Sequence, residues 1–274
     1  MKNTHRMLVP LAGFVLTGLA LAAGQDRVTI PLTDPSQPVS LKASVLNGGI
    51  TVKGSASKEV IVEARVRDQD PGGEDGGRRR IPINATGLSA EEENNQVEIG
   101  VDSIQRTVDL DITVPYRTSL ILRSVNNGDI KVTGVNGELD VNNVNGEVTL
   151  TDVSGNAVAH ALNGRVLVTF RAVNTAQPMA FSSLNGDIDV TFPADLKAKV
   201  SIKSDRGEVY SDFDIKMTTE APQQIIEGKR SKSGKYVVKI DKTVRGTIGG
   251  GGQEIQFTNF QGSIYIRKAG KSSD

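Results

Sequence analysis

Apolar and polar residues alternate in short segments along most of the chain, and in its centre a glycine precedes each segment. Gly128, Gly137, Gly146, Gly155 and Gly164 follow one another at intervals of nine residues. One apolar residue stands two positions after each of these glycines, and another stands four positions after it. Alternation with a period of two is typical of a half-buried β-strand. Each nine-residue unit therefore predicts a strand of about five residues followed by a corner.

Two all-β architectures are built from such a unit. The recurring Asn-Gly pairs are strong hairpin signals and fit an antiparallel meander. In a β-solenoid, by contrast, two units form one coil, and each coil stacks in parallel on the next. The later glycines, Gly164, Gly186 and Gly207, favour the solenoid because they are 22 and 21 residues apart, with apolar segments at 179–181 and 200–202 between them. We therefore expect a single-stranded β-solenoid (β-helix) with two strand–corner units per coil, flanked by an N-terminal β region.

The glycines mark the expected corners of the coils. Because asparagine and glycine tolerate left-handed backbone angles, the Asn-Gly pairs suit sharp corners. Structural corners are expected at Gly128, Gly137, Gly146, Gly155, Gly164, Gly186 and Gly207. Stacked coils would then form an inward ladder of Ile130, Val148, Val166, Ile188 and Val209.

The residue after every second corner faces outward and belongs to a candidate binding column. The acidic members of this column are Asp129, Glu147, Asp187 and Glu208, with Arg165 among them. Adjacent strands lie about 4.8 Å apart, so the carboxylates would recur at rung spacing. A second outward column is expected to consist of Thr133, Thr151, Thr169 and Thr191, which fits the high β propensity of threonine.

The first residues of the chain have the composition of a targeting segment. Lys2 and Arg6 precede an uncharged apolar run that ends in small residues around Ala23. This pattern predicts a cleaved signal peptide at residues 1–23, with a retained membrane anchor as the alternative. We therefore expect export across the inner membrane, to the periplasm or the cell surface.

The rest of the chain is expected to be one domain. Residues 24–268 are assigned to the solenoid, with a loop insertion at 68–95 that is rich in glycine and charge. Residues 269–274 are expected to be a disordered tail. Because the end rungs of a solenoid are open strand edges, we expect the strands before Pro115 and the segment 262–268 to cap them.

The composition argues against several classes of function. Lys+Arg and Asp+Glu number 32 each, so the balanced charge favours no nucleic-acid partner. The absence of cysteine excludes disulfides and thiol ligands. His160 is the single histidine outside the expected signal peptide, which leaves too few ligands for an ordinary zinc site. The glycine run 249–252 is not followed by the Lys-Ser/Thr of a phosphate-binding loop. We expect no catalytic residue, cofactor or metal.

Several phrases together resemble a known family. They are the strand 112–115 ending in Val-Pro, the Asn-Gly-Asp-Ile phrase at 127–130 with its nine-residue units, the glycine run 249–252 and the Gly-Ser-Ile-Tyr-Ile phrase at 262–266. This pattern, over about residues 40–268, is similar to that of the DUF4097 family of exported bacterial adhesin-like proteins. The resemblance implies a β-solenoid of stacked short strands. Because the shared phrases are structural, it supplies no catalytic residues.

The expected function is that of an exported, non-catalytic surface or envelope protein, an adhesin-like binding or scaffold module. A stiff rod with repeated outward columns would hold a partner by many weak contacts in register. The expected partners are cell-envelope polysaccharide, surface proteins, or further copies of the chain through the open end rungs. One alternative is a polysaccharide-active β-helix enzyme that uses its outward carboxylates as acid and base. Another is a self-assembling envelope scaffold.

Overall fold

The computed structural model describes residues 25–67, 85–102, 106–174, 177–218 and 243–270, together with the backbone of four short strands, β5 (Glu74–Asp75), β6 (Arg78–Arg79), β20 (Gln224–Glu227) and β21 (Val237–Ile240). The expected signal peptide lies outside these residues. Every described secondary-structure element is a β-strand. Within the same residues, no helix is long and apolar enough to span a membrane.

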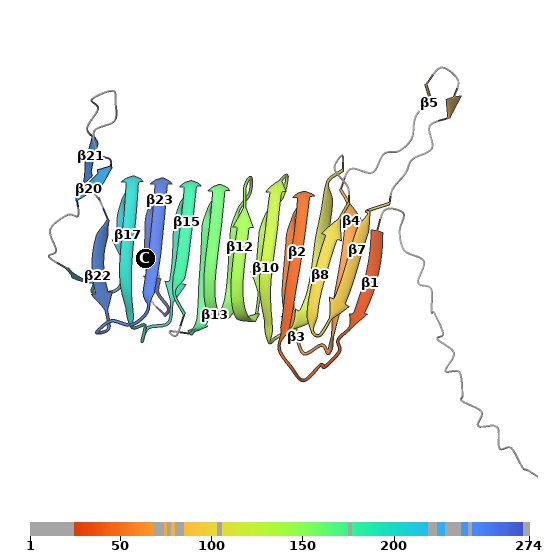
Figure 1. The fold of residues 1–274 in the computed structure, drawn as a ribbon, viewed down its shortest axis with the longest axis horizontal. Helices are drawn as coiled ribbons and strands as arrows, with labels where there is room; N and C mark the ends of the chain where they lie inside the picture. Colours follow the sequence, from red (N-terminus) through yellow and green to blue (C-terminus); the bar gives the residue numbers. More distant parts are fainter. Residues whose placement is uncertain are drawn as a thin grey trace, which may run out of the picture.

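Two rows of strands lie face to face and enclose one core. The first sheet runs in the order β8 (Gln96–Val101), β2 (Val39–Asn47), β10 (Thr118–Asn126), β12 (Asn136–Asn143), β13 (Val148–Asn163), β15 (Met179–Asn185), β23 (Glu254–Gln261) and β17 (Ala198–Arg206). These strands stand side by side across Figure 1.

The second sheet contains β9 (Val108–Pro115), β3 (Ile50–Ser55), β11 (Ile130–Thr133), β13, β14 (Val166–Val173), β16 (Ile188–Phe192), β24 (Ile264–Lys268) and β18 (Val209–Ser211), in that order. The long strand β13 belongs to both sheets and carries the chain from one to the other.

Parallel pairing joins successive coils in the centre of the molecule. Ile130 lies beside Val148, and Val148 lies beside Val166. The same offset of 18 residues joins Leu139 to Ala157 on the first sheet. Two nine-residue units therefore separate one rung from the next here. The observed stacking confirms the expected all-β, solenoid-like fold.

The core is a thin double layer of aliphatic side chains. Alternate residues of the central strands point inward, and Ile130, Val148 and Val166 are each 0% exposed. Towards the C-terminal end the layer becomes aromatic, because Phe170, Phe181, Phe192 and Phe257 cluster between the sheets. Since the chain has no tryptophan, these phenylalanines supply the bulky aromatic side chains of the core.

The order of the rungs differs from the order of the sequence at the C-terminal end. The last coil, β23 and β24, is inserted between β15–β16 and β17–β18, so that Ile264 pairs with Ile188 on one side and Val209 on the other. The predicted direct contact between Ile188 and Val209 is therefore wrong. The prediction that segment 262–268 caps the solenoid is also wrong, because that segment lies inside it. The same Gly-x-apolar-x-apolar pattern fits any rung, so the periodicity alone could not give the order of the rungs in space.

The N-terminal end has the mirror arrangement. The first coil, β2 and β3, lies between β8–β9 and β10–β11. Beyond it the sheets end in antiparallel strands, with β1 (Gln25–Pro31) and β4 (Glu59–Val66) on the second sheet and β7 (Leu88–Glu93) on the first. The strands before Pro115 therefore do cap this end, as expected. At the C-terminal end, the antiparallel strands β22 (Val244–Ile248) and β19 (Lys216–Met217) continue the first sheet.

The expected insertion at 68–95 is shorter than predicted. Residues 88–93 form β7 and pair with β8, so the segment returns to the sheet before residue 95. Because this segment is polar and rich in glutamate, it lacks the apolar alternation from which a strand would be predicted. Most of 68–84 lies outside the described residues. At the other end, the N–H of Ala269 donates to the carbonyl of Phe192 at 2.8 Å, and the part of the expected tail at 271–274 lies outside the described residues.

Most corner glycines are required by close approach rather than by backbone angle. Of the seven predicted corners, Gly155 and Gly186 have positive φ, at 110° and 153°. A Cβ on Gly146 would collide with the carbonyl oxygen of Gly128, and a Cβ on Gly164 would collide with that of Gly146. Among the predicted Asn-Gly corners, positive φ occurs at Asn127 (62°) and at Gly186, so left-handed backbone angles account for only some of the corners. Glycine recurs because successive corners stack backbone on backbone, which leaves no room for a side chain.

Four asparagines next to the corners, Asn126, Asn145, Asn163 and Asn185, form a hydrogen-bonded ladder. The Nδ2 of Asn145 donates to Oδ1 of Asn126 at 2.8 Å, and Asn163 donates to Asn145 at 2.8 Å. Asn185 continues the ladder by donating to Asn163 at 2.7 Å. Each amide is both donor and acceptor, so an unbroken row needs the same residue in every rung. This ladder explains the recurrence of Asn better than turn propensity does.

Candidate functional site

The acidic column faces outward on the second sheet, as predicted, but its four members are not contiguous. Asp129 and Glu147 occupy adjacent rungs, just before the paired residues Ile130 and Val148. Arg165 separates Glu147 from Asp187. Ser263, from the inserted strand pair, separates Asp187 from Glu208. The rung order therefore breaks the column that the sequence predicted to be nearly continuous.

Two of these carboxylates hold the corners together. Oδ1 of Asp129 accepts the backbone N–H of Glu147 at 3.0 Å, and Oδ1 of Asp187 accepts the N–H of Ser263 at 2.8 Å. Asp109 makes the same contact with the N–H of Gly49 at 2.8 Å. Each aspartate thus ties its own rung to the next, which gives these residues a structural role.

The two glutamates are also engaged. Oε2 of Glu147 accepts Nε of Arg165 at 2.9 Å, and its Oε1 accepts the hydroxyl of Thr149 at 2.8 Å. The carboxylate of Glu208 accepts the hydroxyl of Tyr210. A carboxylate that already has close partners is less free to transfer a proton.

The threonine column is present where it was predicted. Thr133 pairs with Thr151, and Thr169 pairs with Thr191. The backbone between these two pairs shifts register by a bulge within β13. Three of the four side chains are exposed, so each pair contributes at least one exposed threonine to the outer face of the second sheet.

At the C-terminal end of the same face, two tyrosines stack on each other. Tyr210 in β18 pairs with Tyr265 in β24, and their ring centroids are 5.2 Å apart with planes 8° from parallel. The guanidinium of Arg267 lies 5.2 Å from the centroid of the Tyr265 ring. The same guanidinium is bound by both carboxylate oxygens of Asp189, at 2.8 and 2.9 Å.

The local electrostatics hold this cluster in one arrangement. The hydrogen bond to Glu208 and its negative charge raise the pKa of Tyr210, so the phenol stays protonated and continues to donate. The hydrogen bond to Asp189 raises the pKa of Arg267, which keeps the ion pair charged. The cluster is therefore an ordered set of two rings, one cation and two carboxylates.

Sequence reasoning overlooked these tyrosines, although a signal was present. Tyr210 and Tyr265 each stand three positions after a corner glycine, in Gly-Glu-Val-Tyr and Gly-Ser-Ile-Tyr. Asp189 occupies the same position after Gly186. Side chains at the same distance from the corner glycine lie side by side when their rungs are neighbours. The order of the rungs is not evident from the sequence, so the neighbourhood of Asp189, Tyr265 and Tyr210 could not be predicted.

The first sheet carries an apolar outward column beside the asparagine ladder. Its members occupy one register position in six successive strands and are Leu46, Val125, Val144, Leu162, Leu184 and Phe260. The outer members are about two-fifths exposed, and the three in the middle are half-buried. Each side chain shields its neighbours, so the column stabilises the stacking of the rungs.

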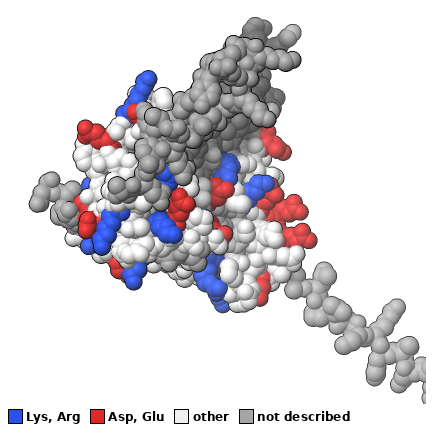
Figure 2. All heavy atoms as spheres, turned by 60° about the vertical axis from the view of Figure 1, so that its left-hand side comes forward, with Lys and Arg blue, Asp and Glu red and all other residues white. Residues whose placement is uncertain are grey.

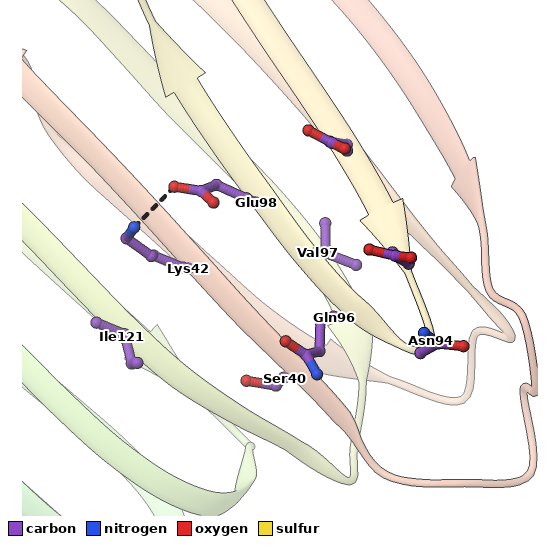
Figure 3. A pocket seen from close by; sticks show the side chains of 9 residues that line it. Ser40, Lys42, Asn94, Gln96, Val97, Glu98 and Ile121 are labelled. Atoms are coloured by element: carbon purple, nitrogen blue, oxygen red, sulfur yellow. Dashed lines mark hydrogen bonds and ion pairs between the residues drawn. The ribbon is translucent and has the colours of Figure 1, made fainter.

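A shallow hollow of about 320 Å³ lies near the N-terminal end of the first sheet (Figure 3). Ser40, Lys42, Gln96 and Glu98 line it together with residues of β7. Nζ of Lys42 lies 2.7 Å from Oε1 of Glu98, but both side chains are more than half exposed, so the pair contributes little to stability. No group of three or more metal-binding side chains occurs among the described residues.

His160 faces outward from β13, as predicted, and is half-buried. Its Nδ1 lies 2.7 Å from the hydroxyl oxygen of Ser182 in the next rung. Burial lowers the pKa of His160, so the ring is neutral at pH 7. The register neighbours on either side are Asn142 and Ser182, and neither carries a charge that could orient the imidazole as a catalytic base.

Comparison with known proteins identifies the family. A family model described as "Toastrack DUF4097" matches residues 22–248. No protein with a curated description matches the chain. A solved Clostridium sporogenes structure, a "putative cell adhesion protein", is 12% identical, with a TM-score of 0.43 over 89% of this chain and 99% of that one. A Bacteroides fragilis "putative adhesin" is 13% identical, with a TM-score of 0.33 over 89% and 96%. The family match covers most of the chain, which therefore belongs to the Toastrack DUF4097 family.

Proposed function

We propose that the protein is an exported, non-catalytic adhesin-like module that binds a polysaccharide of the cell envelope. The observation that carries this proposal is the register of the second sheet. Thr133 lies beside Thr151, and Thr169 lies beside Thr191, on a frame closed by hydrogen bonds at every corner. Equivalent polar side chains thus recur at rung spacing across the strands. A polymer with its own short repeat could contact several rungs at once.

The strength of such binding would come from the number of contacts. One hydroxyl contact on an exposed sheet is weak, but several contacts along one chain act at high effective concentration. A rigid frame adds to this effect, because its outward groups lose little conformational freedom on binding. Figure 2 shows Lys, Arg, Asp and Glu interspersed over the C-terminal side of the molecule. This mixture favours a largely neutral ligand over a highly charged one.

The enzymatic alternative has one candidate pair, Asp129 and Glu147. A glycoside hydrolase needs one carboxyl group that protonates the leaving oxygen and a second that is free to attack or to activate water. Here Asp129 accepts a backbone N–H, and Glu147 binds Arg165 and Thr149. These contacts favour binding over catalysis as the role of the face.

The test is capture of polysaccharide from the producing cell's envelope by the immobilised chain beginning at Gly24. In the variant T133R/T169R, bulky cations block the threonine column at two exposed positions. The matched control, S44R/T258R, places the same charge at exposed positions of the first sheet. Capture should fall by about tenfold in the first variant and remain unchanged in the control.

The other outcomes separate the alternatives. If T133R/T169R captures as much polysaccharide as the control S44R/T258R, the threonine column is not the binding site. No capture by the unmodified chain would overturn the proposal. If the unmodified chain also sediments as assemblies that grow with protein concentration, the result would favour a self-assembling scaffold as the function.

A further inference from the structure

The tyrosine stack lies at the last strand of the second sheet. Among the described residues, β18 pairs with β24 and with no other strand. One face of the Tyr210 ring is covered by Tyr265, as the separation of 5.2 Å requires. In the part of the chain that the structure describes, no ring or cation covers the opposite face, and the residue is 48% exposed. Tyr210 therefore presents a flat aromatic surface to solvent.

Polar groups stand around this surface in fixed positions. The carboxylate of Glu208 is held by the Tyr210 hydroxyl, and Asp189 holds Arg267 against Tyr265. The rings themselves have few rotatable bonds, and each is fixed by its neighbour. Because the groups are ordered before any ligand arrives, binding would cost little conformational entropy.

The charge of the cluster limits the class of ligand. Arg267 is neutralised by Asp189, and Glu208 adds a negative charge beside the free ring face. An anion would be repelled from this position. An aromatic surface bordered by acceptors and a donor instead matches a group with C–H bonds on one face and hydroxyls on its edge. A neutral pyranose ring has that structure.

We propose that the free face of Tyr210 binds a neutral pyranose ring of the envelope polysaccharide. This inference rests on the proposed function and places one sugar at the C-terminal end of the same outward face. The C–H face of the sugar stacks on Tyr210, and its hydroxyls bond with the carboxylate of Glu208. The threonine column begins at Thr191 in β16, two strands away from β18 on the same sheet, so one polymer could contact both.

The test is electrophoresis of the protein in native gels that contain the envelope polysaccharide, with retardation as the readout. Tyr210→Ala removes the platform at an exposed position of an end strand, and Tyr210→Phe keeps the ring but removes its hydroxyl. Tyr116→Ala is the matched control, because Tyr116 is 52% exposed and lies at the other end of the molecule, beside β9. Circular dichroism verifies that each variant is folded.

We expect the unmodified protein, Tyr210→Phe and Tyr116→Ala to be retarded, and Tyr210→Ala to lose about tenfold in affinity. Equal retardation of Tyr210→Ala and Tyr116→Ala would overturn this inference. If T133R/T169R still loses retardation in that case, the proposed function stands. No retardation of the unmodified protein would overturn both proposals.

A second measurement uses the absence of tryptophan from the sequence. Tyr210→Trp keeps an aromatic face at this position, enlarges it, and introduces the chain's single tryptophan. Its fluorescence should change as oligosaccharides released from the envelope polysaccharide are added, with the same midpoint as the gel assay. An unchanged emission alongside retained retardation would place the sugar elsewhere. If Tyr210→Ala instead abolishes self-association in sedimentation without polysaccharide, the platform binds a second copy and the inference is wrong.

Discussion

Nδ2 of Asn143 lies 3.0 Å from the carbonyl oxygen of Gly128, the corner glycine of the preceding coil, and donates a hydrogen bond to it. Ser124 bonds the carbonyl of Gly48 in the same way at 2.8 Å, and Ser183 bonds that of Gly164 at 2.9 Å. These donors occupy one buried position in successive rungs of the first sheet. They satisfy corner carbonyls that the strand ladder leaves free.

Between Ser124 and Ser183, one rung of this column lacks the donor, which leads to a stabilising substitution. Ala161 lies between Asn143 and Ser183 in the column and is fully buried. By the spacing of its neighbours, a serine hydroxyl at this position would reach the carbonyl of Gly146. Ala161→Ser should therefore raise the free energy of unfolding by about 0.5–1 kcal/mol, measured by urea denaturation. A loss of stability would mean that the corner has no room for the added oxygen.

Gly146→Ala should be strongly destabilising. Its Cβ would overlap the carbonyl oxygen of Gly128, a backbone atom that cannot move without separating two coils. We expect a loss of about 3 kcal/mol or more in the free energy of unfolding. Gly100→Ala is the matched control, because the nearest atom to its Cβ is the flexible hydroxyl of Ser89 at 3.1 Å. Similar losses in the two variants would contradict the close-approach explanation.

The inserted C-terminal strand should contribute as much to stability as the central strands. Phe257 is 1% exposed, and its ring lies 5.5 Å from that of Phe181. Phe257→Ala should cost about 3–5 kcal/mol, the usual range for a buried phenylalanine. Phe260→Ala, three residues later in the same strand but 40% exposed, should cost much less. If thermal unfolding shows equal effects, β23 does not lie between β15 and β17.

Stability should depend on pH through His160. Burial lowers the pKa of His160 in the folded protein below the ordinary value of 6.5. As the pH falls below about 6.5, the unfolded chain therefore binds the proton first, and the folded state loses stability until the folded pKa is passed. Between about pH 7.5 and 5.5, the wild-type protein should lose more free energy of unfolding than His160→Gln.

The carboxylates titrate in both proteins, so the difference between the two curves isolates the histidine. Parallel curves would show that the imidazole is solvated in the folded state. A steeper loss in His160→Gln would reverse the sign of the expected effect.

Some features could be predicted from local residues alone. The spacing from Gly128 to Gly164 encodes strand length, inward and outward faces, and the 18-residue step between paired rungs, because the side-chain period of a strand is two. The same reasoning placed Asp129 and Thr133 on the outward face. The role of Asn145 and Asn163 was misassigned to backbone angle, since a side-chain ladder between rungs has no signature within one unit.

The sequence by itself therefore determined the all-β fold, the orientation of each strand's two faces and the candidate columns. Only the tertiary structure decided which rungs are neighbours. Ile188, Ile264 and Val209 stand in equivalent phrases, and the contacts that order them join residues 76 and 55 positions apart. That order separates Asp187 from Glu208 and brings Tyr210 onto Tyr265. Pairing between distant equivalent strands is chosen by how whole coils close and fill the core, and short-range periodicity contains no information about that choice.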